Sequence, residues 1–332
     1  MFGSKVNAPP IIKAIGVGGG GCNAVRSMIE ARVKGVVYIL ANTDFPSSRQ
    51  TEDYMRIQLG ESLTHGRGAG SDPEIGRKAA LESSSLIAQA LDQADLVFIA
   101  AGMGGGTGTG AAPVIAEIAR NAGILTVGVV TKPFPYEGKR RMQQAEAGIS
   151  QLKQAVDSLM VIPNERLGKL GEKELSVRDA FRPANLILHH AIRGISELIH
   201  TEGHINVDFA DLRTIMSRRG MAIMGIGSAQ GPQRAEQAAK RAMNSPLLER
   251  VDISQAKGVL VNIAGSSSMT LDEFHKVAEI IQEKMVDDVE IITGLVIRDD
   301  LGEVMQITAI FTGGNKVLSR PPLYSIKPIH EI

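Results

Sequence analysis

One stretch, Leu96 to Pro113 (LVFIAAGMGGGTGTGAAP), constrains the fold more than any other part of the chain. Its first six residues are apolar and rich in β-forming side chains, so they predict a buried strand. Six glycines and two threonines follow, and helical periodicity is clear after Pro113. This order of strand, glycine loop and helix N-terminus favours an anion site, because backbone N–H groups and the helix dipole then point at one ligand.

Two interpretations of this glycine loop are open, a flexible turn and a phosphate site. Flexible turns seldom lie between a buried strand and a helix, so we favour the phosphate site. Thr107 and Thr109 could add hydroxyls for phosphate oxygens or for a metal. The chain contains no GxxxxGK[ST] pattern, so the loop is not of the Walker type.

A second joint of the same kind lies near the N-terminus. Ile11 to Val17 predicts a strand, the run GGGG at Gly18 to Gly21 follows, and we expect an apolar helix from Ala24. Such a glycine pattern is a weak signal alone, since many Rossmann-like proteins carry one. Two such joints in one parallel sheet strengthen each other.

Further strands end in polar residues. Val36 to Ala41 is followed by Asn42, Thr43 and Asp44. Ligands bind at the carboxyl ends of strands in α/β sheets, which places Asp44 near the site, although it could be an ordinary turn or N-cap residue. We also expect strands at 125–131 and 158–163, and a helix after the loop 66–73, with Asp72 as its N-cap. This alternation predicts a parallel sheet with helices on both faces.

The sequence changes character in its second half. Residues 176–201 predict one long helix or a helix pair with a wide apolar stripe, buried between two domains, and Pro183 marks a break or a first turn. Adjacent His189 and His190 should point in different directions and lie at a surface or interface. Beyond Gly203 we expect an α+β domain with strands at 220–229, 257–265, 289–298 and 304–312. The last two should form an antiparallel hairpin.

Composition narrows the class of protein. The 332 residues are 43% hydrophobic and carry 36 basic and 36 acidic side chains, so overall charge gives no argument for a nucleic acid or an anionic membrane. Aromatic residues make up only 4%, which argues against base stacking on aromatic platforms. The single cysteine, Cys22, fits a reducing compartment, and no signal peptide or membrane span is visible, so we expect a cytoplasmic protein.

These loops, in this order, resemble the tubulin/FtsZ family of polymerising GTPases, and within it the branch of bacterial division proteins. The resemblance covers residues 11–313. It is carried by the motifs GVGGGG (16–21), NTD (42–44), GAG (68–70), GGGTGTG (104–110), VTKPF (130–134), EGKRR (137–141), IPN (162–164), DAFRPAN (179–185) and NVDFAD (206–211).

The resemblance implies an α/β fold with a Rossmann-like parallel sheet, a long central helix and a second α+β domain. The expected ranges are an N-terminal tail at 1–10, a GTP-binding domain at 11–175, the central helix at 176–202, a C-terminal GTPase-activating domain at 203–313 and a short tail at 314–332.

It also implies a site for GTP or GDP with Mg²⁺. The glycine loops would hold the phosphates, Glu137 and Arg141 would meet ribose and phosphate, Phe181 would stack on the base, and Asn164 and Asn185 would bind the base edge. An i,i+4 ion pair is the simpler interpretation of Glu137 and Arg141. The nucleotide-binding residues expected are Gly18, Gly19, Gly20, Gly21, Asn23, Asn42, Asp44, Gly70, Gly104, Gly105, Gly106, Thr107, Gly108, Thr109, Gly110, Pro133, Glu137, Arg141, Asn164, Phe181 and Asn185.

Asn206, Asp208 and Asp211 resemble the loop that reaches the γ-phosphate of the next subunit in a filament. Carboxylates beside an amide can orient a water for phosphoryl transfer, although Asp208 could simply cap a helix. The expected partners are further copies of the chain, head to tail, other subunits of the same family and other division proteins at the division site, and no nucleic acid is expected.

Three features depart from the family pattern. Leu186 stands where an aspartate is usual, Pro183 is unusual, and the chain ends at Ile332 without the linker and peptide that bind membrane anchors. We therefore expect no direct membrane binding, whether the sequence is truncated or a tail-less paralogue. Two other functions stay open, a polymerising scaffold with little hydrolysis and, more weakly, a Rossmann-type dinucleotide oxidoreductase.

Overall fold

The computed structural model describes residues 9–45, 53–167, 182–200, 207–217, 220–249, 251–286, 288–313 and 316–317, and the structural statements below refer to them. The strands are β1 (Ile12–Val17), β2 (Val36–Asn42), β3 (Met55–Gln58), β4 (Leu96–Gly102), β5 (Leu125–Lys132), β6 (Ser158–Pro163), β7 (Gly220–Ala229), β8 (Val251–Asp252), β9 (Gly258–Gly265), β10 (Glu290–Ile297), β11 (Met305–Thr312) and β12 (Lys316–Val317). The helices are α1 (Gly18–Glu30), α2 (Glu61–Thr64), α3 (Pro73–Glu82), α4 (Ser84–Leu91), α5 (Thr107–Asn121), α6 (Lys139–Ala155), α7 (Asn164–Leu167), α8 (Arg182–His200), α9 (Phe209–Met216), α10 (Arg234–Met243) and α11 (Leu271–Gln282).

A ten-stranded sheet runs through the molecule in the order β10-β9-β11-β7-β6-β5-β4-β1-β2-β3. In the part of the sheet ordered β7-β6-β5-β4-β1-β2-β3, all neighbouring strands are parallel, as the alternation of strands and helices predicts. Strand β7 continues this sheet into the C-terminal half, and β11 runs antiparallel to both β7 and β9. The strand and helix assignment thus confirms the α/β class, while the expected domain ranges stay predictions.

The predicted hairpin between the last two long strands is wrong. Strand β9 lies between β10 and β11, paired parallel to β10 and antiparallel to β11. Every residue of β9 is buried, so it takes the central position and separates two strands that are neighbours in sequence. The β9-α11-β10 segment is instead a parallel crossover unit. The short connection between β10 and β11 led to the prediction of a hairpin.

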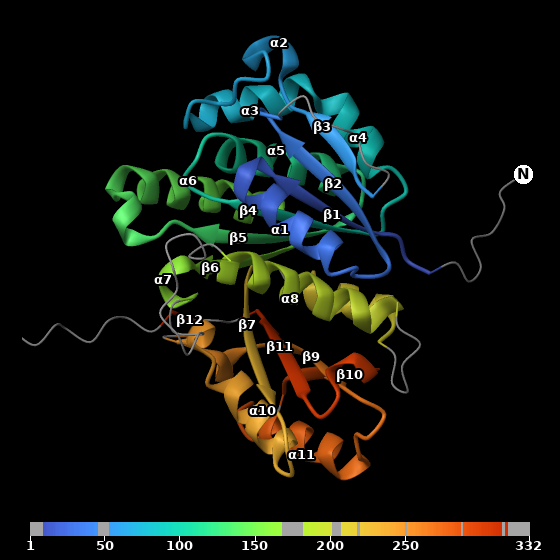
Figure 1. Cartoon of the computed structure of the whole chain (residues 1–332). Coiled ribbons are helices and arrows are strands. Elements are labelled where there is room, and N and C mark those ends of the chain that lie inside the picture. The colour runs from blue at the N-terminus through green and yellow to red at the C-terminus, as the bar shows by residue number, and fades with distance from the viewer. Residues whose placement is uncertain are drawn as a thin grey trace, which may run out of the picture.

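Helix α8 lies between the upper and lower groups of elements in Figure 1. Its apolar residues, among them Ile192 and Ile195, share one core cluster with α1 and β4 on one side and with Leu260, Val296 and Ile310 of the C-terminal strands on the other. The opposite face of the N-terminal strands packs on α3 to α6, and that of the C-terminal strands on α10 and α11. No described helix has the length and apolar composition needed to cross a membrane.

Two helices begin earlier than predicted. Helix α1 starts at Gly18 and not at Ala24, and α5 starts at Thr107 and not after Pro113, which lies inside it. Several of these glycines serve close packing: a Cβ on Gly21 would lie 2.1 Å from the Ala100 carbonyl oxygen, and one on Gly110 would lie 1.9 Å from that of Pro73. The low helix propensity of glycine is therefore overridden by packing.

His189 and His190 do not point in different directions. Their rings stack with centroids 5.6 Å apart and an interplanar angle of 6°. His189 is buried, and His190 lies beside Gln306 of β11, its Nδ1 3.3 Å from the amide nitrogen. The pair therefore lies at an interface and not at the surface. Burial, followed by neighbouring positive charge that includes Arg193 and Arg298, lowers the pKa of each ring to about 4.

These pKa shifts predict acid sensitivity of the fold. Each ring stays neutral in the folded protein below its ordinary pKa of 6.5, whereas the unfolded chain takes up protons there. Stability should therefore be intact above pH 6.5 and fall towards pH 4, by on the order of 2 kcal/mol per histidine at pH 5. Denaturant unfolding at each pH should show a smaller fall in the double variant His189→Gln/His190→Gln. The exposed-site control His275→Gln should behave like the native chain. An unchanged pH dependence in the double variant would contradict the assignment.

Candidate functional site

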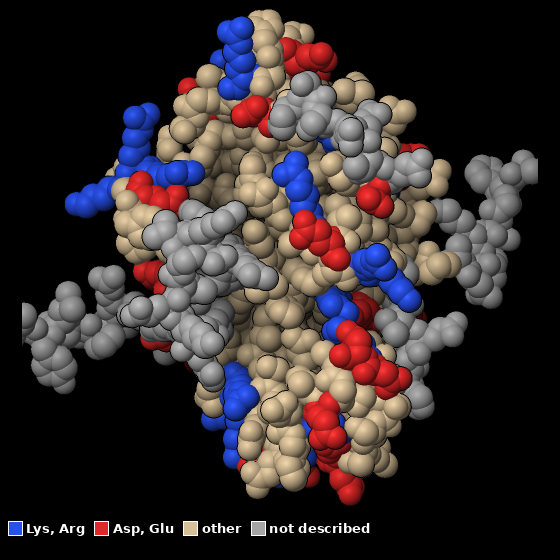
Figure 2. Space-filling view, in the orientation of Figure 1, with Lys and Arg blue, Asp and Glu red and all other residues tan. Residues whose placement is uncertain are grey.

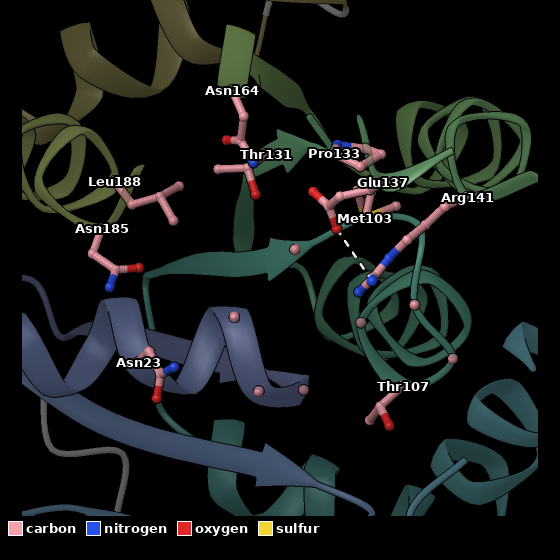
Figure 3. Close-up of a pocket in the computed structure, with 17 residues that line it drawn as sticks. Asn23, Met103, Thr107, Thr131, Pro133, Glu137, Arg141, Asn164, Asn185 and Leu188 are labelled. Atoms are coloured by element: carbon pink, nitrogen blue, oxygen red, sulfur yellow. Dashed lines mark ion pairs between the residues drawn. The ribbon is translucent and has the colours of Figure 1, made fainter. Parts of the chain in front are cut away.

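A cavity of about 430 Å³ opens at the carboxyl ends of β4, β5 and β6, between the first turns of α1, α5 and α8 (Figure 3). Its walls are mostly backbone at one end and amide side chains at the other. The lining residues are Gly18, Gly19, Gly20, Asn23, Gly102, Met103, Gly105, Gly106, Thr107, Gly108, Thr131, Pro133, Glu137, Arg141, Asn164, Asn185 and Leu188.

The first turns of α1 and α5 touch each other at the backbone end. Gly18 has φ +70°, and a Cβ there would lie 2.9 Å from the Gly108 nitrogen. A Cβ on Gly20 would lie 3.4 Å from Cα of Gly102. Two helix N-termini, whose first N–H groups have no partner within their own helix, thus converge on one space, which gives a positive potential without a lysine.

The two threonines of the glycine loop have different places. Thr109 is buried, and its hydroxyl accepts a hydrogen bond from the Gly104 N–H at 2.8 Å, which holds Gly104 at φ +101°. Thr107 lines the cavity. Of these two threonines, Thr107 is therefore the one that offers its hydroxyl to a ligand.

Glu137 and Arg141 form the ion pair drawn in Figure 3, with Arg141 Nη1 3.1 Å from Glu137 Oε2. The other carboxylate oxygen of Glu137 accepts the Phe134 N–H at 2.8 Å, which caps the short 3₁₀ helix Pro135–Glu137. Arg141 has a half-exposed side chain beside Gly105. The simple ion-pair interpretation is confirmed, and both residues also line the cavity.

The amide end of the cavity holds an unused acceptor. Asn164 is only 4% exposed, and its Oδ1 has no hydrogen-bond partner within the described residues. Asn185 and Leu188, from the first turns of α8, line the same end. Leaving a buried acceptor unpaired costs about 1–3 kcal/mol, so this end of the cavity is suited to a ligand that donates hydrogen bonds. Leu186 is exposed and does not line the cavity.

Thirteen of the predicted nucleotide-binding residues line this cavity. Seven others do not: Gly21, Asn42, Asp44, Gly70, Gly104, Thr109 and Gly110. Phe181 and the predicted catalytic Asn206 lie outside the described residues. The list of predicted nucleotide-binding residues left out Gly102, Met103, Thr131 and Leu188, which also line the cavity, although Gly102 was counted in the glycine loop. Gly102, Met103 and Thr131 lie at strand ends beside predicted loops, and this position could have identified them as lining residues. Leu188 belongs to the apolar stripe of the long helix, so no sequence pattern distinguished it from a core residue.

Asn42 and Asp44 form a strand-end turn next to the cavity. The Asn42 amide donates to the Asp44 carbonyl oxygen at 2.8 Å, and the Asn42 Oδ1 accepts the Thr43 N–H at 3.0 Å. Asp44 is exposed beside Gly68 of the α2–α3 loop, and Gly70 lies in that loop with φ +55°.

Asp208 and Asp211 lie at the opposite edge of the sheet from the cavity. Asp208 is the N-cap of α9 and accepts the Ala210 N–H at 3.1 Å, so the capping interpretation is confirmed. Arg213 of the same helix donates to the Gly123 carbonyl oxygen, just before β5 begins, whereas the far end of β5 reaches the cavity at Thr131. Eight strand residues at about 3.3 Å each separate these ends by roughly 25 Å. Both aspartates are exposed there.

Fold and site together define a nucleotide-binding α/β protein of the kind in which helix N-termini hold phosphates. Comparison with known families makes this specific: the model of the tubulin/FtsZ family GTPase domain matches residues 11–172, and that of the FtsZ family C-terminal domain matches residues 220–315. The chain belongs to the FtsZ family, and its N-terminal half is a GTPase domain of that family.

Several relatives are similar over most of their length. The cell division protein FtsZ of Buchnera aphidicola subsp. Acyrthosiphon pisum is 50% identical, over 93% of this chain and 81% of the relative. That of Pseudomonas putida is 47% identical, over 97% and 81%. A solved structure of an empty FtsZ dimer from M. jannaschii is 38% identical, covering 98% of this chain and 96% of that one, with a TM-score of 0.88.

The surroundings of Gly19 predict that a substitution there weakens nucleotide binding without destabilising the fold. A Cβ on Gly19 would have no described atom within 4 Å, although the residue lines the cavity inside α1. Gly19→Ala should therefore leave the thermal unfolding temperature equal or higher, since alanine favours helix by about 1 kcal/mol. The new methyl should weaken nucleotide binding at least about tenfold, because it occupies space at the converging N–H groups. Native affinity, measured by fluorescent-nucleotide titration, would show that Gly19 does not face the ligand.

Proposed function

We propose that this chain binds GTP with Mg²⁺ in the cavity and hydrolyses it at a site completed by a second copy, in filaments built head to tail. The observation that carries the proposal is that the cavity proposed to bind the nucleotide and the acidic residues proposed to assist hydrolysis are far apart in one subunit. The cavity lies at one edge of the sheet, and the acidic residues Asp208 and Asp211 lie at the other.

The amide end of the cavity supports a guanine base. Guanine offers two neighbouring donors, an N1–H and an exocyclic NH₂. The unpaired Oδ1 of Asn164 can accept one of them, and Asn185 can accept or donate beside it. With the base at that end, Glu137 and Arg141 of the cavity wall would meet ribose and phosphate, and the two helix N-termini would take the remaining phosphates.

Magnesium is part of this proposal through the phosphates. The described residues include no group of three or more His, Cys, Asp or Glu side chains that could hold a metal ion. Mg²⁺ needs none, since it keeps several waters and binds largely to substrate phosphates. The hydroxyl of Thr107 and the backbone donors fit such an arrangement, in which the ion would neutralise phosphate charge.

A subunit cannot bring Asp211 to its own cavity without breaking the sheet. If the α9 edge of one subunit faces the cavity of the next, the acidic side chains can orient a water against the outermost phosphate. This interface is heterologous, because two different surfaces meet, and a heterologous interface that does not close into a ring gives a filament. The M. jannaschii relative is described as a dimer, and a protofilament is described for the more distant CetZ2 of Haloferax volcanii.

The names of the relatives extend the proposal to biology. Cell division protein FtsZ is the name of each curated relative cited above. We therefore propose a role in cell division, in the cytoplasm at the division site, with copies of the chain and other division proteins as partners.

Removal of the Asp211 carboxylate separates binding from hydrolysis. Asp211→Ala should lose most GTP turnover, at least about a hundredfold, while GTP affinity stays within about twofold, because the residue serves the neighbouring subunit. Asp272→Ala is a matched control, since Asp272 is also exposed in the first turn of a helix, α11. Turnover and fluorescent-nucleotide binding are measured on each variant. Joint loss of binding and turnover in Asp211→Ala would mean that the residue belongs to the fold or to its own cavity.

A further inference from the structure

Thr43 connects the phosphate end of the cavity to three other segments. It follows β2, is 0% exposed, and its hydroxyl oxygen lies 2.6 Å from that of Thr107. Its carbonyl oxygen accepts hydrogen bonds from the Gly68 N–H at 3.1 Å, the Gln58 amide at 3.0 Å and the Thr64 hydroxyl at 3.3 Å. One buried residue thus joins α5, the end of β3, α2 and the α2–α3 loop.

Proton counting fixes the direction of the hydroxyl pair when an anion is bound. Each threonine hydroxyl has a single proton. A phosphate oxygen only accepts, so Thr107, which lines the cavity, must donate its proton to the phosphate. The hydrogen bond between the two hydroxyls then has Thr43 as its donor. Hydrogen bonds in such a chain polarise and strengthen one another.

The position of Thr107 indicates which phosphate is concerned. In Figure 3 Thr107 lies across the cavity from Asn164 and Asn185. A nucleotide with its base at the amide end therefore extends its last phosphate towards Thr107. The α2–α3 loop packs at this end, since a Cβ on Gly106 would lie 2.8 Å from Cβ of Ala69 and 3.0 Å from the Asp72 nitrogen.

We propose that Thr43 is a positioning residue for the outermost phosphate: it donates to Thr107, orients the Thr107 hydroxyl towards that phosphate, and through its carbonyl holds the α2–α3 loop against the same end of the cavity. The inference rests on the proposed function of GTP binding. It adds a residue whose side chain does not line the cavity and whose hydroxyl acts on the phosphate only through Thr107.

The test compares GTP and GDP affinity in variants that separate the hydroxyl from the methyl group. Thr43→Val removes the hydroxyl, and Thr43→Ser keeps it. Thr126→Val is the matched control: Thr126 is also 0% exposed and bonded through its hydroxyl, to the Ile124 carbonyl oxygen, at the other end of β5. Binding is measured by fluorescent-nucleotide titration, and thermal unfolding without nucleotide reports the fold.

Thr43→Val should weaken GTP binding about tenfold, the loss expected for one hydrogen bond in a charged network, and GDP binding less than about threefold. Thr43→Ser and Thr126→Val should keep the native ratio. In a Thr107→Val background, Thr43→Val should cause no further loss, because its effect passes through Thr107.

Three results would overturn the inference: equal losses for GTP and GDP, an unaltered GTP affinity in Thr43→Val, or equal losses in the serine and valine variants. If Thr43→Val does not fold, Thr43→Ala measured against Thr43→Ser isolates the same hydroxyl. A native chain that binds neither nucleotide would instead refute the proposed function, so the two failures are distinguishable.

Discussion

The contact between the first turns of α1 and α5 is the interaction on which the rest of the structure depends. Gly18 approaches the Gly108 nitrogen so closely that a side chain at Gly18 would clash, and Gly21 and Gly110 bring the same helices against β4 and α3. This packing requires β1 and β4 to be adjacent and parallel, as they are, so that both helices begin at the same edge. The resulting pair of helix N-termini attracts phosphate through backbone groups and leaves side chains free for the base and ribose.

The same sheet separates the proposed nucleotide-binding cavity from α9, which carries an acidic residue proposed to assist hydrolysis. Parallel strands place every carboxyl end at the cavity edge, so α9, which reaches the start of β5, lies beyond ligand distance. Helix α8 spans both halves of the molecule through one shared apolar core and also contributes Asn185 and Leu188 to the cavity. The charge pattern is compatible with contact between copies, since Figure 2 shows acidic and basic side chains interspersed over the visible face.

Local pattern predicted five of the six strands from β1 to β6 and thirteen of the residues that line the cavity, because apolar runs, glycines and strand ends are features of neighbouring residues. The short strand β3 was not predicted. Asp72, for example, caps α3 as expected, with Pro73 in the first turn. The errors concern non-local packing. The starts of α1 and α5 inside glycine runs depend on close approach to other elements, the position of β9 between β10 and β11 depends on burial of a central strand, and the stacked His189 and His190 depend on the surface against which α8 packs. Thr43 was passed over between Asn42 and Asp44, because its hydroxyl partner lies 64 positions away.

The central claim is that one subunit's cavity needs a second subunit for hydrolysis, and the most direct measurement is GTP turnover per subunit as protein concentration rises, with light scattering recorded alongside. The account predicts low specific activity in dilute solution and an increase that begins where scattering begins. Scattering with negligible turnover would favour a polymerising scaffold. Specific activity that is the same at every concentration, including those without scattering, would show that each subunit carries a complete site and would contradict the account.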